Sequence, residues 1–393
     1  MDTSNREHIN SLQDQRPPGS TMLLKEVEGH DLPLSTLHRA FGANRLHHAY
    51  LFQGPSGVGK RRSALAMARL LLCLDLQDQA GRREACGDCK SCRRINRFLH
   101  DEADAYHPDL HVISRQRDRL GKLAKEIKIA PIRELQSALS LGSFEGGRSI
   151  VIIEEVDRLG LSAANALLKT LEEPLPNVHF FLTTNSLNAV LPTIKSRAQS
   201  LRFAPLNSQT LYRLLQRYES QPVSYGEDQV YSPLSDAQRE SLSQLSGGSL
   251  GRALSLWSYG GMDKVESLIQ ESDRNGGPQD ILGALEFAKR FEKATETELA
   301  LWVHLLRCWY RDALVISHGA QEVSLFFPTY REYTAQRGHQ LGAQRLMWRL
   351  QALDEAESHM LKRTGSNRKL IMETLCLYLA GFDALNQRPL QLS

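Results

Sequence analysis

Residues 54–61 have the residue types and spacing of a loop that binds phosphate groups. They read Gly-Pro-Ser-Gly-Val-Gly-Lys-Arg. In the related pattern G-x-x-x-x-G-K-[ST], backbone N–H groups surround the phosphates, the lysine reaches the outer phosphates, and the last hydroxyl ligates Mg²⁺. The last position here is Arg61, which has no hydroxyl. We therefore expect a phosphate cradle without a complete magnesium site, with the candidate nucleotide-binding residues Gly54, Gly57, Gly59, Lys60 and Arg61.

The flanking segments are those that would position such a loop. Residues 49–52 form an apolar run that predicts a buried strand, and residues 62–72 are rich in helix formers without glycine or proline. A strand, a glycine loop and a helix together aim helix N–H groups at an anion. The alternative is a glycine turn without a ligand. The strand predicted before the loop and the helix predicted after it argue against this alternative.

Four of the six cysteines follow this helix with the spacing C-x12-C-x2-C-x2-C. Four thiolates hold Zn²⁺ tetrahedrally at structural sites, and the x2 spacing lets successive cysteines turn back onto one ion. A disulfide pair is the alternative, but nothing in the sequence indicates an oxidising compartment. We expect a structural zinc ion bound by Cys73, Cys86, Cys89 and Cys92, and core positions for Cys308 and Cys376.

Four further apolar runs predict the strands of a parallel sheet. Helical segments such as residues 132–141 and 162–172 separate them. Alternation of continuous apolar strands with helices is typical of a parallel sheet covered on both faces, which binds ligands at the carboxyl ends of its strands. The predicted strands are residues 109–113, 149–153, 178–182 and 200–203.

An acidic pair, Glu154 and Glu155, directly follows one of these strands. It resembles a Walker B element, four apolar residues followed by Asp and Glu, whose first carboxylate supports the Mg²⁺ shell and whose second polarises the attacking water. Glu154 is one methylene longer than the expected aspartate, so it suits octahedral Mg²⁺ less well. Solvated charges at a strand end are the alternative.

Length and composition limit the possible classes of protein. A chain of 393 residues is expected to form two or three domains. Its 41% hydrophobic and 24% charged residues are typical of a globular protein, and a net charge of +3 does not by itself indicate nucleic-acid binding. No apolar run suggests a membrane span or a signal peptide, so we expect a cytoplasmic protein without a membrane partner. Residues 1–22 lack apolar periodicity and are expected to be a flexible extension.

Four more segments complete a resemblance to a known family, namely residues 46–52, 163–174, 181–185 and 193–198. With the phosphate loop and the cysteine insert, they resemble the clamp-loader branch of the AAA+ ATPases, most of all the delta-prime subunits of bacterial DNA polymerase III. The resemblance implies a P-loop α/β domain over residues 23–206 with a zinc module over 73–92, a small helical lid over 207–262, and an all-α collar over 275–393.

The resemblance also implies a function and partners. A delta-prime-like subunit is a stator in a five-subunit ring that loads the sliding clamp onto primed DNA. Its partners would be the gamma/tau and delta subunits, the clamp, and primed DNA through the assembled complex. Arg197, in Ser-Arg-Ala where the family has Ser-Arg-Cys, would be an arginine finger for a neighbour's nucleotide. A surface or helix-capping arginine is the alternative.

Two weaker matches concern nucleotide sensing. Thr184 and Asn185 match the sensor 1 position, which reads the γ-phosphate, and Arg252 resembles the lid arginine called sensor 2. Threonine and asparagine are common at strand ends, however, and an arginine on a helix usually faces solvent.

The departures at Arg61 and Glu154 separate the two nearest subunit types. We expect absent or very weak ATPase activity in the isolated chain, and any ATP or ADP that it binds would be bound non-productively. A gamma-type clamp-loader ATPase, active in its own right, is the main alternative. A stand-alone zinc-containing P-loop protein fits the first domain but leaves Ser196 and Arg197 unexplained.

Overall fold

A computed structural model describes most of the chain. It covers residues 24–79, 81–100, 106–117, 123–145, 147–220, 233–258, 265, 269–270, 281–292, 294–320, 323–361 and 368–381. The chain forms two compact units, divided chiefly after Pro205. The expected extension over residues 1–22 lies outside the described residues.

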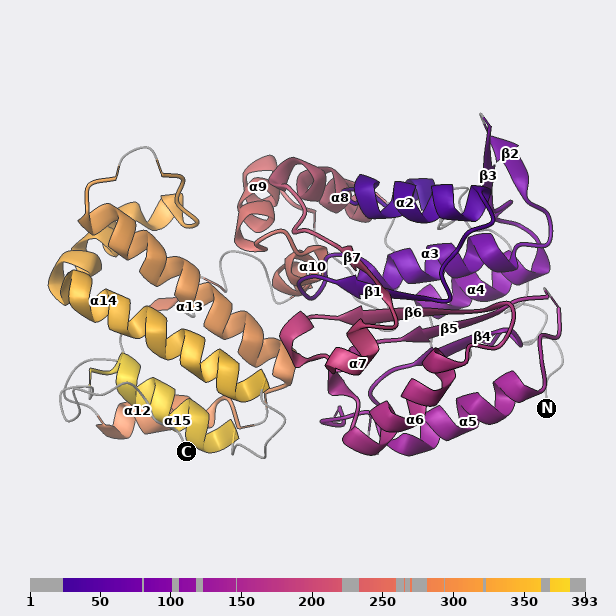
Figure 1. The fold of residues 1–393 in the computed structure, drawn as a ribbon. Coiled ribbons are helices and arrows are strands. Elements are labelled where there is room, and N and C mark those ends of the chain that lie inside the picture. Colours follow the sequence, from indigo (N-terminus) through magenta and orange to yellow (C-terminus); the bar gives the residue numbers. More distant parts are fainter. Residues whose placement is uncertain are drawn as a thin grey trace, which may run out of the picture. The chain divides into compact units, whose positions relative to one another are not determined.

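The first unit is built on a five-stranded parallel sheet with the strand order β4-β5-β6-β1-β7 (Figure 1). All five expected strands are confirmed. Their burial explains the sequence pattern, because β5 and most of β6 are buried on both faces and so lack polar alternation. The strands are β1 (Ala49–Gln53), β4 (Leu110–Ile113), β5 (Ser149–Ile153), β6 (Val178–Thr184) and β7 (Gln199–Arg202).

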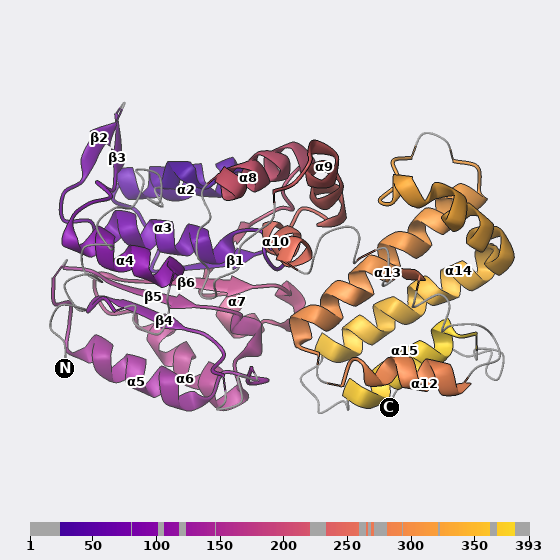
Figure 2. The ribbon, with the colours of Figure 1, turned by 180° about the vertical axis from the view of Figure 1, so that it is seen from behind.

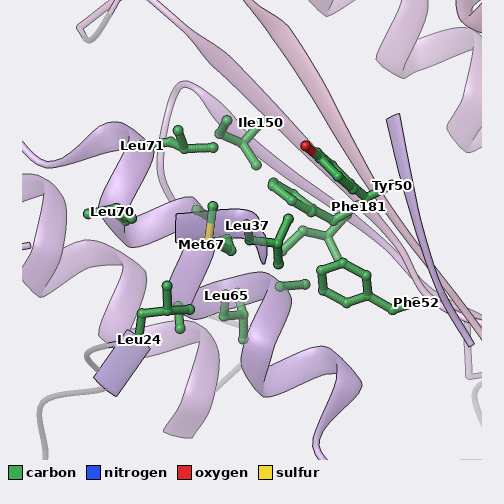
Figure 3. Close-up of a cluster of buried hydrophobic side chains, with 14 of the residues drawn as sticks. Leu24, Leu37, Tyr50, Phe52, Leu65, Met67, Leu70, Leu71, Ile150 and Phe181 are labelled. Atoms are coloured by element: carbon green, nitrogen blue, oxygen red, sulfur yellow. The ribbon is translucent and has the colours of Figure 1, made fainter. Parts of the chain in front are cut away.

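Helices cover both faces of this sheet (Figures 1 and 2). One face is covered by α2 (Asp31–Gly42), α3 (Lys60–Leu72) and α4 (Lys90–His100), and the other by α5 (Ile129–Ser140) and α6 (Leu161–Glu172). Figure 3 shows Leu37 of α2 and Leu65 and Met67 of α3 packed towards Tyr50, Phe52 and Phe181 of the sheet. This packing fixes α3, and therefore the loop at its N-terminus, against the centre of the sheet.

Short elements complete the first unit. A small antiparallel hairpin precedes α4, one turn of helix precedes α2, and further turns follow β5 and β6. They are η1 (Leu24–Glu26), β2 (Gln77–Gln79), β3 (Arg82–Glu84), η2 (Val156–Arg158), η3 (Leu187–Ala189) and α7 (Pro192–Lys195).

The described part of the second unit is helical. Its elements are α8 (Ser208–Ser220), α9 (Asp236–Leu245), α10 (Leu250–Ser258), α12 (Ile281–Lys289), α13 (Glu296–Ser317), η4 (Pro328–Tyr330), α14 (Arg331–Leu361) and α15 (Arg368–Leu379). The apolar side chains of α13 form part of the core of this unit, since Trp302 and Trp309 are buried and Trp309 Nε1 donates to Thr334 Oγ1 at 3.1 Å. A parallel-sheet α/β unit followed by a helical region is thus confirmed. Within the described residues, no helix is both long and apolar enough to cross a membrane.

Candidate functional site

The phosphate loop joins β1 to α3 at the carboxyl edge of the sheet. Gly54 is required there by close packing, because a Cβ at this position would lie 2.1 Å from Phe203 O. Gly59 has φ +112°, which favours glycine, and it passes the ring of His30. His30 Nε2 lies 2.6 Å from Val58 O. The loop is therefore held from two sides by the fold.

Lys60 is buried, and its ammonium group is bound inside the loop. Nζ donates to Gly54 O at 2.7 Å, to Pro55 O at 2.5 Å and to Asn185 Oδ1 at 2.9 Å. Burial lowers the pKa of Lys60 to about 8, although the charges of Asp157 and Glu155 act to raise it. Three acceptors match the three donors of an ammonium group, so phosphate oxygens would have to displace them.

The two residues that depart from the magnesium-binding pattern face each other. Arg61 Nε donates to Glu154 Oε1 at 2.5 Å, and Arg61 Nη2 donates to Phe98 O of α4 at 3.0 Å. Both side chains are largely buried. A fixed guanidinium thus neutralises the carboxylate that would support a magnesium shell.

The second carboxylate of the pair is also neutralised by an arginine. Arg115 donates to Glu155 through Nε at 2.6 Å and through Nη2 at 3.2 Å. Asn185 Nδ2 donates to Glu155 Oε1 at 3.3 Å, so this amide joins Glu155 to Lys60. Arg115 was not predicted from the sequence, although it follows β4 by two residues and so lies on the same edge of the sheet.

The residues assigned to sensor 1 have different surroundings. Thr184 is fully buried, and the two acceptors within reach of its single hydroxyl hydrogen are Asp157 Oδ1, 2.7 Å from Oγ1, and Ser186 O, 3.0 Å from it. Asn185 is exposed and contacts Lys60 and Glu155 as described above. Of the two, Asn185 is the residue that the structure brings to the loop.

Arg197 lies just after α7 and contacts α6 and α7. Its Nη2 forms an ion pair with Glu172 Oε1 at 2.7 Å, and its Nη1 donates to Thr193 O at 2.9 Å. About one third of its side chain is exposed, 33%. These contacts are surface contacts, separate from those of Lys60.

Arg252 belongs to the second unit. Its Nη1 donates to Ser246 O at 3.0 Å, and it lies close to Gly247. Burial lowers the pKa of Arg252. The contacts of this arginine are with its own helical unit.

The four clustered cysteines come together between α3 and α4. Their Sγ atoms all lie within 4.8 Å of one another, with 3.6 Å between Cys73 and Cys86 and 4.0 Å between Cys86 and Cys92. Four sulfurs around a zinc ion with bonds of about 2.3 Å would lie about 3.8 Å apart. The cluster could therefore hold a metal ion. Cys308 and Cys376 are buried, as expected.

Backbone N–H groups turn towards these sulfurs. Cys86 N donates to Cys73 Sγ at 3.3 Å, and Cys89 N donates to Cys86 Sγ at 3.3 Å. Gly87, between them, has φ +87°, which makes glycine favourable in this turn. Donors aimed at sulfur favour thiolates, the form that binds a metal.

Comparisons with known proteins agree along most of the chain. A family model described as "DNA polymerase III, delta subunit" matches residues 29–207, and one described as "DNA polymerase III, delta subunit, C terminal" matches residues 274–380. The delta' subunit of DNA polymerase III from Bacillus subtilis (strain 168) is 29% identical over 351 residues, which cover 88% of this chain and 94% of the relative. The chain belongs to the delta-prime family of DNA polymerase III subunits. The resemblance expected from the sequence is confirmed.

Two further relatives show how the match is distributed. The delta' subunit from Escherichia coli (strain K12) is 29% identical over 341 residues, covering 86% of this chain and 90% of the relative. The gamma/tau subunit from Mycobacterium tuberculosis (H37Rv) is 31% identical over 206 residues, covering 52% of this chain and 33% of the relative. Of these three relatives, the two delta' subunits match most of this chain, and the gamma/tau subunit matches about half of it.

Proposed function

We propose that this delta-prime family member is a clamp-loader stator. In this role, it helps to load the sliding clamp onto primed DNA, and it leaves ATP hydrolysis to neighbouring subunits. The observation that carries the proposal is the ion pair of Arg61 with Glu154. An active site needs a hydroxyl and a carboxylate free to support Mg²⁺ between the phosphates. Here one position carries a cation and the other is already paired with it.

The remaining contacts of the loop support the same conclusion. The ammonium of Lys60 is bound by two loop carbonyls and Asn185, and Glu155 is bound by Arg115. A nucleotide would have to replace the lysine contacts and would meet no free acidic pair. ATP or ADP, where bound, would therefore be held without magnesium and without turnover. The retained cradle is the one feature that favours the alternative of a gamma-type ATPase.

The contribution of this subunit to catalysis would be made at a neighbour's nucleotide. Arg197 follows a one-turn helix and keeps part of its guanidinium in solvent. A planar, permanently charged fork suits the oxygens of a transferring phosphoryl group. For this role the ion pair with Glu172 must open when the neighbour binds, and an exposed pair costs about 1 kcal/mol or less to break. In this proposal Thr184 and Arg252 serve the folding of this subunit, and Asn185 binds the ammonium group of Lys60.

The cysteine cluster would hold one structural zinc ion. Its sulfur spacing fits tetrahedral coordination and its turns supply N–H donors to the sulfurs. Four protein ligands leave no position open for a substrate, so the ion would stabilise the module of residues 73–92. It would contribute no step to a reaction.

The helical unit would supply the contacts of assembly. In this proposal residues 23–206 form the P-loop domain, residues 207–262 a lid, and residues 275–393 a collar that binds the gamma/tau and delta subunits. Reconstitution with those subunits tests the function as a whole. We expect clamp loading on primed DNA only when this chain is included. Failure to copurify with gamma/tau and delta would contradict the assignment to this complex.

A further inference from the structure

Arg69 is a fully buried arginine next to the cysteine cluster. It lies on α3 and is 0% exposed. Nη1 donates to Asn96 Oδ1 of α4 at 2.8 Å, and Nη2 donates to Gly87 O at 2.7 Å. Its Nε is buried without a hydrogen-bond partner. Gly87 lies in the turn between Cys86 and Cys89, so the bond to its carbonyl oxygen holds the guanidinium at the cysteine cluster.

Among the described residues this cation forms no ion pair with a carboxylate, and its N–H groups donate to an amide oxygen and a carbonyl oxygen. The contrast is Arg239, another buried arginine, which forms ion pairs with Glu219 and Asp236. An uncompensated buried charge costs several kcal/mol, so buried cations are normally paired. The negative group that the geometry offers to Arg69 is the cysteine cluster itself.

With a metal ion bound, the cysteine cluster would carry the negative charge that pairs with Arg69. Four thiolates with a divalent ion carry a formal charge of −2. Part of this charge would be buried, because Cys92 is fully buried. A permanent cation alongside offsets part of it, as the surroundings of a metal site commonly do. Neutral thiols would leave Arg69 without a counter-charge.

We propose that Arg69 is the counter-ion and positioning residue of the metal centre. Its charge stabilises the tetrathiolate, and its two N–H groups hold the turn at Gly87 and the helix α4 in the geometry that brings the ligands together. The proposal rests on the zinc site proposed above. It also gives α3 a second role, because this helix carries Lys60 at its start and leads into Cys73 at its end.

The test compares metal binding by the full-length chain and three variants. Arg69→Met removes the charge at similar volume, Arg69→Lys keeps the charge without the planar fork, and Arg93→Met is the control on α4, where an exposed arginine pairs with exposed Asp88. Zn²⁺ affinity is measured by competition with a chromophoric chelator, and Co²⁺ spectra report thiolate coordination. Melting temperatures are recorded for each protein with and without metal.

We expect Arg69→Met to weaken Zn²⁺ binding about 10- to 100-fold, Arg69→Lys to weaken it less, and Arg93→Met to leave it unchanged. The increase in melting temperature on adding zinc should shrink in Arg69→Met. Wild-type affinity in Arg69→Met would overturn the proposal. So would an equal fall in melting temperature with and without metal, which indicates a packing role alone.

Two further outcomes separate this proposal from the zinc assignment. A wild-type chain that binds no zinc would refute the zinc site itself, whereas a wild-type chain that binds zinc as tightly as Arg69→Met refutes only the role of Arg69. If Arg69→Met does not fold, Arg69→Gln tests the charge while keeping an N–H donor. Weaker zinc binding by Arg69→Gln supports the counter-ion role, and unchanged binding contradicts it.

Discussion

The Nε atom of Arg61 lies 2.5 Å from Oε1 of Glu154. These residues are far apart in the sequence, one at the first turn of α3 and the other at the end of β5. Each departs from the pattern that binds magnesium, and the two departures compensate each other in charge. The ion pair leaves Glu154 bound to a side-chain cation beside the phosphate loop.

Breaking this ion pair should cost stability. Glu154→Gln leaves the largely buried Arg61 guanidinium without its carboxylate, and we expect a loss of about 1–3 kcal/mol in the free energy of unfolding. Asp88→Asn is the control, because its ion pair with Arg93 is exposed and should change stability by less than about 0.5 kcal/mol. Unfolding in denaturant measures the stability change of each variant. Equal effects would show that the pair contributes nothing specific.

Lys60 should make the stability of the protein depend on pH in the alkaline range. Its folded pKa of about 8 lies below the ordinary lysine value, 10.5. Between these values the unfolded chain binds the proton that the folded chain has lost, so the contribution of this group rises with pH. Between about pH 8 and pH 10.5 we expect the free energy of unfolding to rise by up to about 3 kcal/mol relative to that of Lys60→Met. Parallel pH–stability curves for the two proteins would contradict the lowered pKa.

The cysteine cluster should bind one zinc ion per chain. Cys89→Ser removes one of four ligands, so we expect loss of the metal and a lower melting temperature. Cys308→Ala is the control, since its thiol is buried in the helical unit and should leave the zinc content unchanged. Elemental analysis and thermal unfolding give both readouts. Zinc-free wild-type protein, purified without chelator, would exclude the site.

Arg197 should act on the assembled ring. Arg197→Ala is expected to leave folding and assembly intact while reducing DNA-stimulated ATP hydrolysis and clamp loading together. An arginine finger contributes about 10³-fold or more at its own interface, and the fall in the total is smaller because other interfaces are unaffected. Arg133→Ala, at an exposed position on α5, is the control.

Two companion variants sharpen that test. Arg197→Lys keeps the charge without the planar fork, and full activity of this variant would indicate charge steering instead of a finger. Glu172→Gln releases Arg197 from its ion pair and should not lower ring activity. A loss with Glu172→Gln as large as that with Arg197→Ala would show that the ion pair itself is required.

The strands could be predicted because their signal is local. Runs such as residues 149–153 are buried on both faces, so a continuous apolar sequence records their position directly. The order of the strands was not predicted. The observed order places β1 between β6 and β7 and brings Gly54, Glu154 and Asn185 to one edge of the sheet. The clustering of the four cysteines was also predicted from their spacing, and their sulfur atoms do come together.

The pairing of side chains at that edge could not be predicted in the same way. The contacts of Arg61 with Glu154 and of Arg115 with Glu155 depend on which rotamers fit between packed helices, and the sequence carries no periodic signal for them. Glu155 adopts φ +49°, an uncommon conformation for a non-glycine residue. The buried hydrogen bond from Thr184 to Asp157 likewise could not be predicted from the sequence and became visible only in the folded structure.

ATP hydrolysis by the isolated chain tests the central claim most directly. The assay uses purified full-length protein with Mg²⁺ and ATP, beside Lys60→Ala as the control for contaminating ATPases. We predict no turnover above that control, because Arg61 and Glu154 neutralise each other where the metal would bind. Turnover that is comparable to that of an active clamp-loader ATPase and is abolished by Lys60→Ala would contradict the stator role.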